Sequence, residues 1–164
     1  MGIFQIALIV ATLLCSLVAG FVFAFAVVVM PGIKDLPDRE FIRAFRVMDR
    51  VIQNNQPVFV FVWVGSVVVL VVTAVLGFGE LDREGRLLMI VATLIYILGV
   101  QVPTVTINVP LNNRLQTLDV DAMSDTASKD ARRDFEPRWI RWNSIRTALA
   151  SLVSTLLMIL LSRL

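Results

Sequence analysis

The sequence predicts an all-α integral membrane protein: a single membrane domain, residues 1–164, forming a four-helix bundle with an amphipathic interfacial helix between spans 1 and 2. Hydrophobic residues make up 57% of the chain and charged residues 17%, and the mean hydropathy is +0.81. A soluble domain averages about 45–50% apolar and about 25% charged residues. Four apolar runs also reach the roughly 20 residues that a helix needs to cross a hydrocarbon core. These observations predict a multi-pass protein of the cell membrane.

The four predicted spans carry no charged side chain away from their ends. They must be helices, because hydrocarbon offers no hydrogen-bond partner to an unpaired backbone amide. The first is longer than the core requires, so we expect it to tilt or to project beyond the core. The spans cover residues 3–30, 58–78, 87–107 and 145–161.

The loop between the first two spans contains a predicted amphipathic helix over residues 38–54. Its apolar residues recur at the spacing of one helical face, and its arginines mostly occupy the other faces. Such a helix lies in the headgroup region of the bilayer or caps the bundle by packing beneath it, and the two interpretations are compatible. The apolar positions are Phe41, Ile42, Phe45, Met48, Val51 and Ile52.

The third span contains Gly99 and Pro103. Proline has no amide hydrogen for the carbonyl four residues earlier, so we expect a bend and a free Gly99 carbonyl. The polar side chains of Gln101, Thr104 and Thr106 are candidates to occupy that carbonyl.

Two further prolines mark expected helix ends. Pro110 follows the third span and is expected to block continuation of its helix. Pro137 ends the polar segment SKDARRDFEP, which we expect to be partly helical up to that residue. A loop over residues 108–144 is therefore predicted before the fourth span.

Basic residues are distributed unevenly about the spans. Twelve of the 15 lysines and arginines lie in residues 31–57, in residues 108–144 or at the rim position Arg146. The positive-inside rule places both of these loops in the cytoplasm and both termini outside.

Composition also narrows the function classes. The chain has no histidine and a single cysteine, Cys15, inside the first span. This removes the histidine-dependent metal and haem sites and the commonest general base near neutral pH. We therefore expect no metal and no cofactor. The pI of about 9.2 accompanies a net charge of only +2, and the spans exclude a soluble nucleic-acid binder.

A polar stripe is predicted at the start of the fourth span. Trp139, Trp142, Asn143 and Arg146 are spaced i, i+3, i+4 and i+7, so they share one side of a helix. Tryptophan belts and cytoplasmic arginines are common at this depth of a membrane. An asparagine and an arginine on an inward-facing stripe additionally need polar partners. The stripe is thus either an interfacial anchor or the wall of a site.

The end of the third span supplies the partners. The segment INVPLNNRL places Asn108, Asn112 and Arg114 at the mouth of the bundle. These amides and the guanidinium either mark only the polar end of the third span, or they form a ring of hydrogen-bond donors around the mouth of the bundle. Asp49 in the first loop is the acid that we expect to close this ring by pairing with Arg146.

Four stretches of the chain together resemble the anthrone oxygenase family of small four-span membrane proteins, many of them catalogued only as a domain of unknown function. The matching motifs are FVFAFAVVVMPGI at 21–33, PDREFIRAFRVMDRVIQNNQPVF at 37–59, NVPLNNRL at 108–115 and FEPRWIRWNSIRT at 135–147. The resemblance covers nearly the whole chain. It implies addition of oxygen to a polyketide anthrone, giving the anthraquinone, without metal or flavin.

The resemblance also implies a set of site residues. Many relatives have Asn at position 49 and His at position 144, where this chain has Asp49 and Ser144. The missing histidine removes one plausible base, and Asp49, placed near the site by the topology and not by the resemblance, is the remaining candidate. The catalytic candidates are Arg146, Asn112, Asn143 and Asp49. The substrate-binding candidates are Trp139, Trp142, Arg114, Asn108, Thr147 and Pro31.

Two functions remain open at this stage. One is a cofactor-independent oxidation of a planar phenolic or anthrone-like lipophilic substrate, in which a flat aromatic ligand enters from the bilayer. The other is a non-enzymatic accessory or scaffold subunit of a larger membrane complex or homo-oligomer. A transporter or channel is disfavoured because its pathway is normally marked by ionisable residues inside the spans.

Overall fold

The computed structural model describes residues 2–164, and all regular secondary structure in them is helical. Four helices are long and apolar enough to cross a membrane: Ile3–Ile33, Pro57–Glu80, Arg83–Gln116 and Asp125–Ser162. The first and third contain π-helical segments, labelled η. In chain order the elements are α1 (Ile3–Ala24), η1 (Phe25–Val29), α2 (Met30–Ile33), α3 (Asp38–Gln53), α4 (Pro57–Glu80), α5 (Arg83–Leu94), η2 (Ile95–Gln101), η3 (Thr104–Asn108), α6 (Val109–Gln116) and α7 (Asp125–Ser162).

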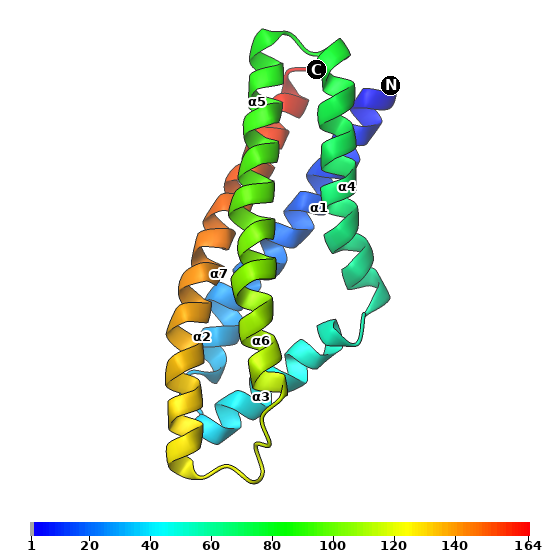
Figure 1. Ribbon diagram of the computed structural model, residues 1–164. Helices are drawn as coiled ribbons and strands as arrows, with labels where there is room; N and C mark the ends of the chain where they lie inside the picture. Colours follow the sequence, from blue (N-terminus) through cyan, green and yellow to red (C-terminus); the bar gives the residue numbers. More distant parts are fainter. Residues whose placement is uncertain (1) are drawn as a thin grey trace.

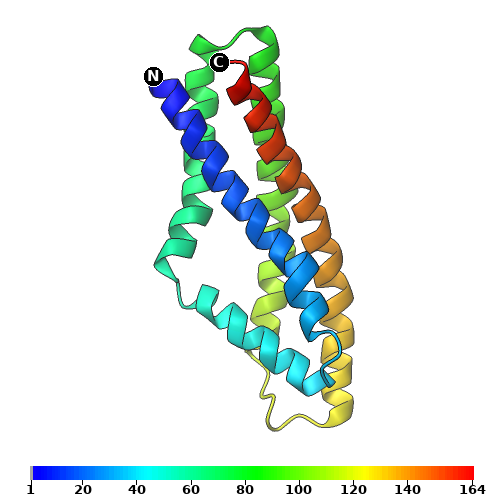
Figure 2. The same cartoon turned by 180° about the vertical axis from the view of Figure 1, so that it is seen from behind.

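The bundle has two distinct ends (Figure 1). Both termini and the short α4–α5 turn lie at one end, called the terminal end here. Helix α3 and the α6–α7 connection lie at the other, called the loop end. Helix α1 runs diagonally through the bundle, from α4 at the terminal end to α7 at the loop end (Figure 2), and it packs against both helices. The predicted membrane bundle and its helical class are therefore confirmed.

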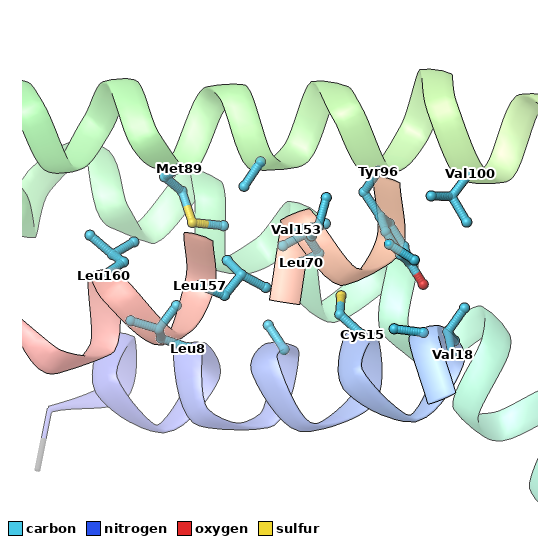
Figure 3. Packing of buried hydrophobic residues seen from close by; sticks show 14 of the residues in the cluster. Leu8, Cys15, Val18, Leu70, Met89, Tyr96, Val100, Val153, Leu157 and Leu160 are labelled. Atoms are coloured by element: carbon cyan, nitrogen blue, oxygen red, sulfur yellow. The ribbon is translucent and has the colours of Figure 1, made fainter. Parts of the chain in front are cut away.

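The terminal half of the bundle is filled by interlocking side chains (Figure 3). Leu8, Leu70 and Leu157 are completely buried there. One polar pair lies in this core, because the hydroxyls of Ser66 and Tyr96 are 2.6 Å apart and satisfy each other. A hydrogen-bonded pair of this kind holds helices together where no water is present. Packed side chains therefore fill this half of the bundle.

A second core at the loop end fixes α3 beneath the bundle. Phe41, Ile42 and Phe45 on α3 are at most 1% exposed and pack against α6 and α7. Beside this face, the Arg46 guanidinium donates to the carbonyls of Leu118 and Gln116 at 2.8 and 3.2 Å. The capping interpretation of this amphipathic helix is therefore the one that its contacts support.

The proline expectations were wrong in three respects. The helix continues through Pro110 into α6, and α7 continues through Pro137. None of the three candidate side chains donates to the Gly99 carbonyl, because Thr104 donates to Val100, Thr106 donates to Val102 and the Gln101 amide nitrogen has no partner. Each of the three π segments ends within two residues of a proline, at Pro31, Pro103 or Pro110. A π turn is wider than an α turn, which makes room for the proline ring without ending the helix.

Arg132 on α7 ties the α2–α3 turn to the bundle. Its guanidinium donates to the carbonyls of Lys34 and Leu36 at 2.6 and 2.9 Å. It also pairs with Glu136 and Asp38 at 2.7 and 3.1 Å. The hydrogen bond to Glu136, opposed by partial burial, raises the pKa of Arg132. A single side chain thus contacts four acceptors, two in the α2–α3 turn, one on α3 and one on α7 itself.

We expect Arg132→Ala to lower the stability of the protein by about 2 kcal/mol, because several charge-assisted hydrogen bonds are lost together. Arg132→Lys should recover little of this, since a single ammonium cannot reproduce the planar fork of donors. Thermal unfolding in detergent measures both effects. Arg133→Ala is the control, because that side chain is 67% exposed. Equal melting temperatures for the Arg132 and Arg133 variants would contradict this assignment.

Candidate functional site

A cavity of about 290 Å³ lies at the loop end of the bundle, between all four membrane-spanning helices and α3. It sits on the loop side of the core that fills the terminal half, and two of the three π segments contribute to its wall. π segments in helices are frequent at functional sites because they redirect side chains. The lining residues are Phe21, Val22, Phe25, Phe45, Asp49, Ile52, Phe59, Trp63, Thr104, Val105, Asn108, Val109, Asn112, Trp139, Asn143 and Arg146.

Aromatic rings form much of the cavity wall. Phe59 and Trp63, one turn apart on α4, are stacked with ring centroids 5.3 Å apart. Phe25 and Phe45 flank Trp139 with centroid distances of 5.7 and 5.3 Å. Aromatic walls favour a flat aromatic guest, which gains offset-stacked and edge-to-face contacts.

Arg146 is a cation buried within this wall, at 4% exposure. Its Nη1 donates to Thr104 Oγ1 at 2.8 Å, and its Nη2 donates to Asn143 Oδ1 at 2.9 Å. Asn143 is itself fixed, because its Nδ2 donates to the Val22 carbonyl at 3.0 Å. The Nε–H of Arg146 is buried without a hydrogen-bond partner. Two neutral side chains thus orient the guanidinium, and its Nε–H remains able to donate a hydrogen bond to a guest.

The expected ion pair between Arg146 and Asp49 is absent from the described residues 2–164. Both side chains line the cavity, so a positive and a negative charge border the same space without forming an ion pair. Removing an unpaired charge from water costs several kcal/mol. This cavity therefore favours an anionic guest next to Arg146.

Asp49 is held by amides instead. Its Oδ1 accepts from Asn112 Nδ2 at 2.7 Å, and its Oδ2 accepts from Gln116 Nε2 at 2.8 Å and Gln53 Nε2 at 3.3 Å. Asn112 Oδ1 in turn accepts from Trp139 Nε1 at 2.8 Å. The chain of bonds runs from α3 through α6 to α7, so Asp49 fixes the orientation of Asn112 and, through it, of the Trp139 indole.

Asn108 supplies a free acceptor to the site. The residue is 2% exposed, and its Nδ2 donates to the Trp139 carbonyl at 3.4 Å. Its Oδ1 is buried without a hydrogen-bond partner. An unpartnered buried acceptor is unusual in proteins and marks a place where a guest can donate a hydrogen bond.

The structure brings six of the ten candidate residues together at the cavity: Arg146, Asn112, Asn143, Asp49, Trp139 and Asn108. The other four lie elsewhere. Trp142 is half-buried and outside the lining, and the Thr147 hydroxyl donates to the Asn143 carbonyl of its own helix. Arg114 borders a surface groove at the α6–α7 contact. Pro31 lines a separate pocket of about 320 Å³ on the far side of Trp139.

Sequence reasoning missed the aromatic wall residues on α1 and α4. Phe21 and Phe25 are part of a uniformly apolar run that gives no signal. Trp63 did carry one, because tryptophan usually lies at the membrane interface and this residue is well inside its span. Its Nε1 donates to Gln101 Oε1 on η2 at 2.9 Å. The sequence places Trp63 and Gln101 at a similar depth in neighbouring spans, so their hydrogen bond could have been predicted.

Over residues 2–164, no group of three or more His, Cys, Asp or Glu side chains lies close enough to hold a metal ion. Asp49 is the one carboxylate in the cavity lining. The cavity residues thus offer an arginine, amides and aromatic rings to a guest.

Fold and site together define a helical, membrane-spanning protein with an aromatic cavity that contains one buried cation and one carboxylate. A profile of the family described as anthrone oxygenase matches residues 45–157, more than half of the chain. The chain belongs to the anthrone oxygenase family. No curated protein and no solved structure matches it.

Proposed function

We propose that the cavity binds a flat, acidic, anthrone-like molecule and that the protein oxidises it with molecular oxygen without a cofactor. The observation that carries this proposal is Arg146, a buried guanidinium beside Asn143 with no carboxylate partner. Family membership supports the substrate class. We further propose that the loop end faces the cytoplasm, as the distribution of basic residues predicts.

The cavity suits such a substrate in size and lining. Its volume of about 290 Å³ is near the lower end of ligand cavities, which run from about 300 to 1,000 Å³. The stacked pair Phe59 and Trp63 and the Trp139 indole offer ring contacts. A phenolic hydroxyl on the guest would donate to the free Oδ1 of Asn108.

The proposed reaction replaces the CH₂ of the central ring with a carbonyl. Asp49 removes one proton from that carbon, and the electron pair moves onto the ketone oxygen as an enolate. Arg146 and Asn143 stabilise the enolate charge, which is the role of preorganised donors. The enolate carbon reduces O₂ to a hydroperoxide that takes up the proton. Loss of water then gives the quinone, so one O₂ is consumed and one H₂O is released per turnover.

The purified protein in lipid nanodiscs should consume oxygen when anthrone is added and form anthraquinone in equal molar amounts. Trp139→Phe should lower kcat/KM by about tenfold, because the loss of the indole N–H frees Asn112 from its fixed orientation. Trp142→Phe should stay within about twofold of the wild type, because that ring lies outside the cavity. An oxygen electrode and quinone absorbance measure both quantities.

Two results would contradict the proposal. One is oxygen uptake at the rate of protein-free nanodiscs. The other is an equal loss of activity in the two tryptophan variants. A stoichiometric partner that copurifies with an inactive protein would instead favour the role of an accessory subunit.

A further inference from the structure

We propose that the cavity is filled sideways from the bilayer, through an opening between α4 and the η3–α6 segment, and that the side chains at this opening select membrane-dissolved planar ligands. This inference rests on the proposed function for the identity of the ligand. The opening itself follows from helix packing, exposure and hydrogen bonds.

Helix α4 separates from its neighbours toward the loop end. It packs against α1 and, nearer the terminal end, against α5. Its loop-end half then diverges from η3 and α6, as both views show (Figures 1 and 2). Phe59 and Trp63 on this half of α4 nevertheless line the same cavity as Val105 and Val109 on the third span. The cavity therefore reaches the space between the two diverging helices.

Two valines show that the cavity is open on this side. Val105 is 66% exposed and Val109 is 38% exposed, yet both line the cavity. Both residues belong to a helix that spans the membrane. Val105 lies within the span predicted over residues 87–107, so its exposed surface faces lipid chains, and a guest that passes it leaves the hydrocarbon without crossing water.

Inter-helix hydrogen bonds frame the opening. Toward the terminal end, Trp63 Nε1 on α4 donates to Gln101 Oε1 at 2.9 Å. Toward the loop end, Asp49 accepts from Asn112 at 2.7 Å, and Gln53 donates to Asn113 at 2.9 Å. From Gln101 to Asn112 the third span rises about 16 Å at 1.5 Å per residue. A three-ring aromatic molecule fits edge-on within such a height.

Packed side chains bound the cavity in three other directions. On the α1 side, Phe21 contacts Phe59 and Trp63 with ring centroids 5.2 and 6.3 Å away. Toward the terminal end, Tyr96 and Val100 are fully buried. Toward the loop end, Phe45 on α3 is 1% exposed. The α4–α6 side is thus the side on which cavity-lining side chains are also widely exposed.

Access from lipid has a consequence for specificity. A neutral anthrone or quinone concentrates in the bilayer and reaches the opening by lateral diffusion. An analogue with a sulfonate group stays in water, because burying its charge in hydrocarbon is costly. The anion needed at Arg146 is then formed after arrival, when the substrate loses its proton inside the cavity.

The test measures association of anthraquinone with the protein in nanodiscs by stopped-flow quenching of tryptophan fluorescence. Val105→Trp places a bulky ring in the opening and should slow association by about tenfold or more, as when access requires a rearrangement. Leu98→Trp is the matched control, because Leu98 is 61% exposed on the same helix but does not line the cavity. It should leave the rate unchanged. Anthraquinone-2-sulfonate at equal aqueous concentration should associate about tenfold more slowly than anthraquinone.

Equal rates for the Val105 and Leu98 variants would overturn the lateral opening, as would equally fast association of the sulfonate. Circular dichroism and size-exclusion chromatography show whether each variant is folded. Phe59→Ala provides a second test, because it widens the opening and should accelerate the association of anthraquinone. Other results would refute the proposed oxidation without refuting the opening, or the reverse. Association of anthraquinone that depends on Val105, without oxygen uptake from anthrone, would refute the oxidation and retain the opening. Oxygen uptake unaffected by Val105→Trp would refute the opening and retain the oxidation.

Discussion

Replacement of Arg146 by methionine is expected to lower anthrone oxidation by about 10²–10³-fold, which is the effect of removing one preorganised donor from a developing oxyanion. The guanidinium is the one cation in the cavity lining, and Thr104 and Asn143 hold it in place. Methionine fills similar space but donates no hydrogen bond. The steady-state rate of oxygen consumption in nanodiscs measures the loss.

The same variant should be at least as stable as the wild type, by 0 to about 2 kcal/mol, because replacing a buried charge with an apolar side chain is often neutral or stabilising. Loss of activity together with retained or increased thermal stability separates a functional charge from a structural one. Arg138→Met is the control, since that residue is exposed and outside the cavity. A destabilised but active Arg146→Met protein would contradict both the site and the reason for the buried charge.

Replacement of Asp49 by alanine is expected to cost about 3 kcal/mol of stability and to abolish oxidation. The carboxylate is 3% exposed and accepts hydrogen bonds from Asn112, Gln116 and Gln53. Its removal leaves amide donors without an acceptor, and each buried unsatisfied donor costs about 1–3 kcal/mol. Thermal unfolding and oxygen uptake measure the two effects.

Small carboxylates separate the two roles of Asp49. If it removes the substrate proton, added formate should restore part of the oxidation rate of the alanine variant without restoring its melting temperature. Asp119→Ala, in the connection between α6 and α7 and outside the cavity, is the control for changes at other acidic residues. An alanine variant that melts like the wild type would contradict the hydrogen-bond network, and full activity without formate would refute the base.

Local sequence patterns predicted the parts of the structure that depend on one helix. Long runs without charge predicted the spans, because in hydrocarbon the backbone amides and carbonyls of such a run must bond to each other in a helix. Helical periodicity predicted that Trp139, Asn143 and Arg146 turn inward together, and all three are buried. Trp142 was grouped with them, but it lies about 60° from Trp139 around the helix. It is at the edge of the stripe, where the position of neighbouring helices decides burial.

The errors concern the continuation of helices through proline and one contact between separate elements. Pro110 and Pro137 were expected to end helices, but the wider π turn before Pro110 accommodates its ring. Pro137 is exposed on the part of α7 that lies outside the predicted span. Arg146 and Asp49 were expected to pair because both were assigned to the rim. Amides of α3 and α6 bind Asp49, whereas Thr104 on η3 and Asn143 on α7 bind Arg146. No local pattern encodes that competition for partners.

The sequence by itself determined that this chain crosses a membrane four times, that a polar stripe faces inward at one end and that the family is that of the anthrone oxygenases. These properties follow from hydrophobicity, helical period and motifs, which are local along the chain. The tertiary structure decided that the diagonal course of α1 and the divergence of α4 leave a cavity there. It also decided that Arg146 enters that cavity without an acid beside it. Packing geometry and the competition for hydrogen-bond partners are properties of the assembled helices, so only the folded bundle determines them.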